Sequence, residues 1–159
     1  MSLFVLDTGI LVGYIRGAGY AEYVEKRFRV NEPPNIPVIS IVTKGEIYSL
    51  AAQFRWGERK RSELDGLLRR LSFVDISSDQ IIKKYAEIDC YSQGKNRSRA
   101  LPAGLTARNM GKNDLWIAAT ASVLNASLLT TDDDFNHLDK LFLEVVRIDQ
   151  RLTGADSDE

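Results

Sequence analysis

The fold of this chain is decided by residues 3–15, which read LFVL and then DTGILVGYI. Four consecutive apolar residues that end at an acid are typical of a parallel strand covered on both faces. The pattern after Asp7 predicts the start of a helix. A buried strand that turns directly into a helix is the repeating unit of an α/β fold.

The same alternation of short apolar runs and helical periodicity continues along the chain. Helical spacing of apolar residues predicts helices at 20–28, 43–54, 58–71, 114–124 and 133–141, and another that begins at Ser78. Further strands are predicted at 37–41, 72–76, 127–130 and 144–148. This order predicts a mostly parallel five-stranded sheet with helices on both faces.

Composition limits the class of protein. A length of 159 residues fits one domain, which we expect to span 1–150, with a polar tail at 151–159 that frays. The net charge of -1 excludes a globally basic nucleic-acid binder, although a local basic patch stays open. The one cysteine, Cys90, excludes an internal disulfide and leaves no Cys/His cluster for zinc.

Targeting signals are also missing from the sequence. The apolar N-terminal run has no basic start and contains Asp7, and no apolar stretch is long enough to span a bilayer. We therefore expect a cytoplasmic protein with no membrane partner.

Four acids fall at or just after the carboxyl ends of predicted strands, where open α/β sheets place their sites: Asp7, Glu46, Asp114 and Asp132. Converging carboxylates repel one another unless a cation neutralises them. Oxygen ligands without His or Cys suit Mg²⁺ or Mn²⁺, which activate water and stabilise the leaving oxygen of a phosphodiester. Helix capping is the alternative for Asp114 and Asp132, but Glu46 lies inside a predicted helix.

Four segments of the chain, in order, resemble the PIN domain, and more narrowly the VapC-type ribonuclease toxins of toxin–antitoxin pairs. They read LFVLDTGILV, SIVTKGEIYSLA, GKNDLWIAATA and LLTTDDDF, and the resemblance covers about residues 3–148. It implies a three-layer α/β/α sandwich and a metal-dependent endoribonuclease. The resemblance implies that Asp7, Glu46, Asp114 and Asp132 carry catalysis and hold Mg²⁺ (or Mn²⁺), with the fourth acid open among Asp132, Asp133 and Asp134.

The resemblance further implies an RNA substrate, a small antitoxin protein as partner and a homodimer. Three aromatic residues beside a predicted helix break could serve a subunit interface: Tyr48, Phe54 and Trp56. We expect hydroxyl groups to hydrogen-bond the acids, from Thr8, Ser40 and Thr130.

Residues 93–113 show no periodicity and predict a loop that is basic and free of acids. Such a loop beside a carboxylate cluster could hold RNA phosphates, or its charges could simply be solvated. The candidate RNA contacts are Lys95, Arg97, Arg99, Arg108 and Lys112.

Two other functions compete with the nuclease. A phosphatase or phosphotransferase with an aspartyl nucleophile would need a second acid after the first strand, where the chain reads Asp7-Thr8-Gly9. A non-catalytic protein-binding module on the same fold would not need all four acidic positions filled, as they are here.

Overall fold

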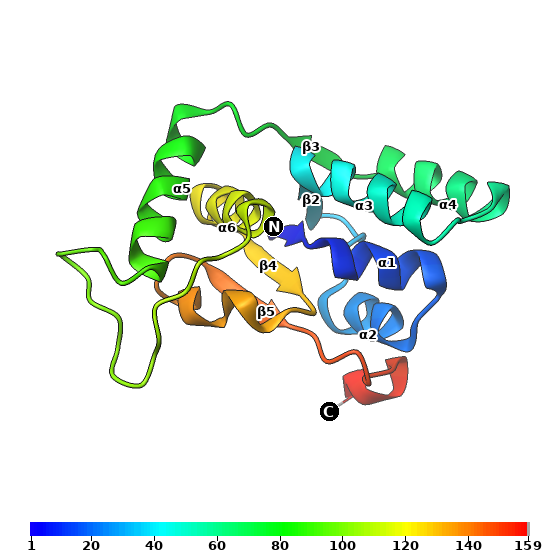
Figure 1. Ribbon diagram of the computed structural model, residues 1–159. Helices are drawn as coiled ribbons and strands as arrows, with labels where there is room; N and C mark the ends of the chain where they lie inside the picture. The colour runs from blue at the N-terminus through cyan, green and yellow to red at the C-terminus, as the bar shows by residue number, and fades with distance from the viewer. Residues whose placement is uncertain (159) are drawn as a thin grey trace.

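The computed structural model describes residues 1–158, and within them the strands form one five-stranded parallel sheet (Figure 1). Its order is β3-β2-β1-β4-β5, with the first strand in the centre, and every neighbouring pair is parallel. The strands are β1 (Leu3–Leu6), β2 (Ile36–Ser40), β3 (Ser72–Val74), β4 (Ser127–Thr130) and β5 (Glu144–Arg147). The predicted parallel sheet is confirmed.

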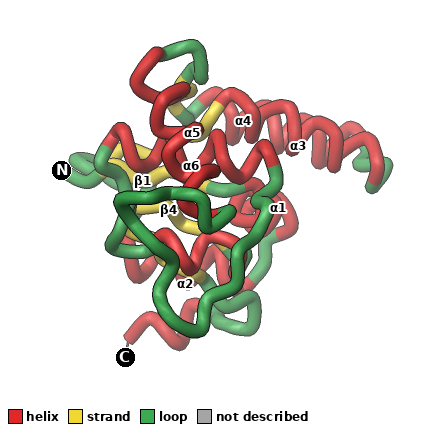
Figure 2. The backbone as a smooth tube through the Cα atoms, turned by 60° about the vertical axis from the view of Figure 1, so that its left-hand side comes forward, coloured by secondary structure: helices red, strands yellow, loops and turns green. Residues whose placement is uncertain are grey.

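Helices cover both faces of this sheet. One face carries α1 (Thr8–Arg16), α2 (Gly19–Phe28), α3 (Ile41–Gln53) and α4 (Glu58–Arg69), and the other carries α5 (Asp79–Ser92), α6 (Lys112–Leu124) and the 3-10 helix η1 (Asp133–Leu138). Successive side chains of a strand point to opposite faces. Accordingly Phe4 and Leu6 pack with the first group of helices, whereas Val5 packs with the second. In Figure 2 the strands lie inside the molecule with helices and loops around them, so the three-layer sandwich is confirmed.

Helices α1 and α3 start immediately at the ends of β1 and β2. Asp7 has an extended backbone, and its side chain accepts a hydrogen bond from the Thr8 backbone N–H, which caps α1. The Ser40 hydroxyl in the same way accepts from the Val42 N–H and caps α3. Because the caps are the last residues before the helices, Asp7 is fixed at the carboxyl edge of the sheet.

Two segments differ in detail from the sequence-based expectation. Ile41 was predicted to end the second strand, but it begins α3 because Ser40 serves as the helix cap. The helix predicted at 133–141 is the shorter η1, which ends at Leu138. Residues 93–111 are an irregular loop between α5 and α6, as predicted, and Figure 1 shows this loop extending away from the body of the molecule.

The tail that we expected to fray contains a second 3-10 helix, η2 (Gly154–Asp158), which packs against α2. A Cβ at Gly154 would come within 2.5 Å of the Glu22 side chain on α2, so the absence of a side chain permits this close contact.

The three aromatic residues expected at a subunit interface have different surroundings. Trp56 is buried in the hydrophobic core on the first face of the sheet, whereas Tyr48 and Phe54 are 44% and 50% exposed. Tyr48 and Phe54 are therefore free to contact a partner, and Trp56 is a packing residue of the domain.

Among residues 1–158, none of the helices is both long and apolar enough to cross a membrane.

Candidate functional site

The carboxyl edge of the sheet brings together Asp7, at the end of β1, and Thr130, at the end of β4. Thr130 Oγ1 donates a hydrogen bond of 2.6 Å to Asp7 Oδ2, and the Thr8 backbone N–H donates one of 2.8 Å to Asp7 Oδ1. Asp7 is only 7% exposed. Both oxygens of this buried carboxylate are therefore held in fixed positions.

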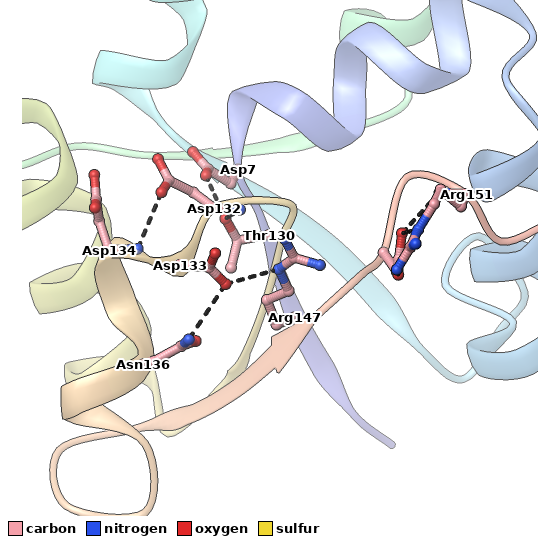
Figure 3. A network of polar contacts seen from close by, with 9 residues as sticks. Asp7, Thr130, Asp132, Asp133, Asp134, Asn136, Arg147 and Arg151 are labelled. Atoms are coloured by element: carbon pink, nitrogen blue, oxygen red, sulfur yellow. Dashed lines mark hydrogen bonds and ion pairs between the residues drawn. The ribbon is translucent and has the colours of Figure 1, made fainter.

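The Thr130 hydroxyl also organises the turn that follows β4. It accepts a hydrogen bond of 3.0 Å from the Asp132 backbone N–H. Asp132 Oδ1 in turn accepts a hydrogen bond of 3.0 Å from the Asp134 N–H and so caps η1. Figure 3 shows the resulting arrangement, in which the side chains of Asp7, Asp132 and Asp134 lie on the same side of the turn.

Three carboxylates gather closely at this edge. Asp114, in the first turn of α6, offers an oxygen that lies within 4.8 Å of oxygens from Asp132 and Asp134, which are themselves within that distance of each other. This upper bound is within about 1 Å of twice the roughly 2.0–2.1 Å that separates Mg²⁺ from its oxygen ligands. The three side chains can therefore approach one divalent ion together.

Asp133, the middle acid of the run, is directed elsewhere. Its Oδ1 lies 3.0 Å from Arg147 Nε on β5 and accepts a hydrogen bond from Asn136 (Figure 3). Of the three acids that the sequence left open, Asp132 and Asp134 thus face Asp114, and Asp133 forms an ion pair.

Glu46 reaches the site from α3, on the first face of the sheet. The Thr8 hydroxyl donates a hydrogen bond of 3.1 Å to Glu46 Oε1. The negative charge of Glu46 is also among the causes that raise the pKa of both Asp7 and Asp114. Thr8 therefore links the carboxylate of Glu46 to the turn that carries Asp7.

Ser40, the third hydroxyl residue that we expected beside the acids, has a different role in the structure. It is fully buried, and its oxygen accepts from the Val42 N–H at 3.3 Å. Its observed contact is the cap of α3, the helix that carries Glu46.

The electrostatics of the site favour a cation. Burial, followed by the nearby charge of Asp7, raises the pKa of Asp114 to about 7. Burial also raises the pKa of Asp7 above its ordinary value, although the hydrogen bond from Thr130 opposes this shift. A divalent cation would offset this repulsion, and a set of carboxylate oxygens is the donor set that Mg²⁺ and Mn²⁺ prefer. The residues present thus fit such an ion.

The basic residues of the loop are not all near the acids. Lys112 begins α6, two residues before Asp114. Arg99 instead lies over the Phe142 ring, 5.0 Å from its centroid. Phe142 precedes the amino end of β5, so Arg99 is at the edge of the sheet opposite the carboxylates. Lys95 and Arg97 are exposed and Arg108 is half-buried.

Asp134 is the site residue that the predicted set did not select. The sequence showed three consecutive acids at 132–134, and the 3-10 helix that begins at Asp133 decides which of them face Asp114. Asp133 forms an ion pair with Arg147 and so does not join the carboxylate cluster. This ion pair depends on the pairing of β4 with β5.

Comparisons with known proteins agree with this architecture. The family model described as PIN domain matches residues 4–141. A chain in the crystal structure of VapBC2 from Rickettsia felis, bound to a DNA fragment from the promoter, is 26% identical with a TM-score of 0.68, and the match covers 92% of this chain and 99% of that one. A search of the curated proteins finds no match.

Two further solved structures show the same similarity. A chain of VapBC-1 from nontypeable Haemophilus influenzae is 25% identical, with a TM-score of 0.65 and coverage of 91% of this chain and 97% of that one. A chain of VapBC-5 from Mycobacterium tuberculosis, a member of the VapBC family of toxin–antitoxin systems, is 21% identical with a TM-score of 0.56. The match covers 92% of this chain and 99% of that one. At this identity it supports the fold alone. The chain therefore belongs to the PIN-domain family.

Proposed function

We propose that this protein is an Mg²⁺- or Mn²⁺-dependent endoribonuclease and the toxin of a toxin–antitoxin pair. The observation that carries the proposal is the cluster of Asp114, Asp132 and Asp134, with oxygens within 4.8 Å of one another at the carboxyl edge of a PIN fold. Asp7 adds negative charge beside this cluster and is a further candidate ligand. We propose that it acts in the cytoplasm, where an RNA substrate would be available.

The proposed chemistry assigns a role to each acid. A bound divalent ion would lower the pKa of a water molecule and neutralise charge on the phosphate. Asp114, Asp132 and Asp134 would hold the ion, and Asp7, fixed by Thr130 and Thr8, would complete its negative environment. Glu46, oriented by the Thr8 hydroxyl, would accept the proton of the attacking water or hold a second ion.

The state of Asp7 argues against the aspartyl-nucleophile alternative. Both oxygens of Asp7 accept hydrogen bonds and the side chain is buried. A carboxylate that must attack a phosphorus atom needs an oxygen that the substrate can reach, and Asp7 is only 7% exposed. A metal-dependent hydrolysis makes no such demand on Asp7.

We propose that Lys112 meets an RNA phosphate, since it begins the helix that carries Asp114. Arg108, Lys95 and Arg97 would extend this contact along the loop, whereas Arg99 would contribute least because it lies over Phe142. The similarity to the VapBC complexes of Rickettsia felis and Haemophilus influenzae supports a small antitoxin protein as the partner of this chain.

The test is an incubation of the purified protein with total RNA and with single-stranded DNA. We expect RNA fragments with Mg²⁺ or Mn²⁺ and intact RNA with EDTA. Cleavage that persists in EDTA, or cleavage of DNA in preference to RNA, would contradict the proposal.

A further inference from the structure

A groove of about 490 Å³ lies along α3. It is lined by one face of the helix and by the residue before Asp114: Val42, Gly45, Glu46, Ser49, Leu50, Gln53 and Asn113. The α3 groove thus includes Glu46, one of the proposed catalytic acids, and extends along the helix to Gln53. A ligand in the groove would be held beside the reacting centre.

The chemistry of this lining does not suit a phosphate group. Among the described residues, the groove is lined by one acid and by no lysine or arginine. Phosphates are bound mainly by cationic side chains and backbone N–H groups. The groove therefore fits an uncharged part of a polynucleotide, which is the base.

The polar groups in the α3 groove are arranged to recognise a base edge. Gln53 Nε2 donates a hydrogen bond of 2.9 Å to Ser49 Oγ, so these two side chains orient each other. Gln53 retains its carbonyl oxygen and its second N–H, and Asn113 offers a further amide. Amide side chains pair with base edges through one donor and one acceptor, and Val42 and Leu50 supply apolar surface for the face of the ring.

Gly45 provides an independent reason to regard this groove as a binding site. It lies in the interior of α3, where glycine lowers helix stability relative to alanine. A Cβ built at Gly45 would meet no described atom within 4 Å, so packing does not require glycine there. The missing side chain leaves the groove open to a ligand.

We propose that the α3 groove binds the base of one nucleotide next to the cleaved phosphodiester, and that Gln53 and Asn113 select this base. The inference rests on the proposed endoribonuclease function and adds the residues that determine its sequence preference. The occupant is single-stranded RNA.

The experiment maps the ends of the fragments that the purified protein produces from total RNA in Mg²⁺. We expect the wild-type protein to prefer one base at a single position beside the cut. Gln53→Ala and Asn113→Ala should each reduce that preference by about 5- to 150-fold, the discrimination of one good amide–base contact. Gly45→Leu should fill the groove and reduce cleavage at the preferred sites.

Two controls separate the groove from the rest of the protein. Leucine favours a helix more than glycine does, so Gly45→Leu should fold and bind Mn²⁺ as the wild-type protein does. Gly66→Leu is the matched variant, because Gly66 also lies in a helix with no described atom within 4 Å of its Cβ, but on α4. It should cleave with the wild-type preference.

The outcomes distinguish the two proposals. If the wild-type protein cleaves RNA, and Gln53→Ala and Asn113→Ala keep its base preference, the inference about the groove is wrong. The proposed endoribonuclease function would then still stand. The inference is also wrong if Gly45→Leu cleaves RNA normally and instead loses binding to a protein partner. The groove would then be a peptide-binding site. If the wild-type protein cleaves no RNA, both the proposed function and the inference are wrong.

Discussion

Thr130 and Asp7 are 123 residues apart in the sequence, yet the Thr130 hydroxyl lies 2.6 Å from the Asp7 carboxylate. The pairing of β4 with β1 makes this contact, and the same hydroxyl accepts the N–H of Asp132. One buried hydroxyl thus connects the acid of the first strand to the turn that carries Asp132 and Asp134.

Thr130→Val should weaken both the fold and the site. Valine has nearly the shape of threonine but donates no hydrogen bond, so Asp7 loses a partner in a buried position. We expect the free energy of unfolding to fall by about 1–3 kcal/mol, measured by urea denaturation, and RNA cleavage to decrease. Thr130→Ser keeps the hydroxyl and should retain more of both properties, and equal losses in the two variants would contradict the role of the hydroxyl.

The stability of the metal-free protein should depend on pH through Asp114. Its pKa is raised to about 7 in the folded protein, above the ordinary value of 3.8 for an aspartate. Between these two pH values the folded state therefore binds more protons than the unfolded state. The contribution of Asp114 to stability is greatest below about pH 4 and is lost as pH rises through about 7. Thermal unfolding in EDTA should show this trend for the wild-type protein.

Asp114→Asn should remove part of this dependence and raise the melting temperature at pH 8, because it removes a repelling charge. Stability in EDTA that rises from pH 5 to pH 8 equally in both proteins would show that Asp114 is not strained by its neighbours.

Asp134 should matter for metal binding, whereas Asp133 should not. Asp134 belongs to the carboxylate cluster, and Asp133 is paired with Arg147. We expect Asp134→Asn to weaken Mn²⁺ binding, measured by calorimetry. Loss of a residue that hydrogen-bonds a metal ligand weakens metal binding by roughly 10- to 100-fold, and loss of a ligand itself should weaken it at least as much. Asp133→Asn is the matched control from the same turn, and an equal loss in both variants would contradict the assignment.

The exposed aromatic residues at the end of α3 should support a homodimer. Light scattering at micromolar concentration should give twice the 17.9 kDa of one chain. Phe54→Ser should shift this mass toward the monomer, because Phe54 is half exposed and apolar. Ile82 is an apolar residue of similar exposure on α5, on the opposite face of the sheet, and Ile82→Ser should leave the mass unchanged. A monomeric wild-type protein would contradict the predicted dimer.

The sequence predicted the sheet and the neighbourhood of the acids for a simple reason. Asp7 directly follows a buried strand and Asp114 opens a helix, so parallel topology alone brings them to one edge. The choice among Asp132, Asp133 and Asp134 depends on the 3-10 geometry of η1 and on Arg147 of β5. These are tertiary features, and no local pattern encodes them.

The position of the loop could not be derived from its charge. The sequence placed five basic residues just before Asp114, but Arg99 packs over Phe142 at the opposite edge of the sheet. Irregular loops are positioned by individual contacts of this kind. The groove beside Glu46 was also hidden in the sequence, because it requires the face of α3 to meet Asn113 from α6.

The most direct measurement of the central claim compares RNA cleavage in Mg²⁺ by the wild-type protein, Asp114→Asn and Asp133→Asn. If the carboxylate cluster holds the catalytic ion, the wild-type protein and Asp133→Asn cleave at similar rates, and Asp114→Asn is slower by roughly 100-fold or more, since loss of the ion removes several kcal/mol of stabilisation. Cleavage by Asp114→Asn at the wild-type rate would contradict the account.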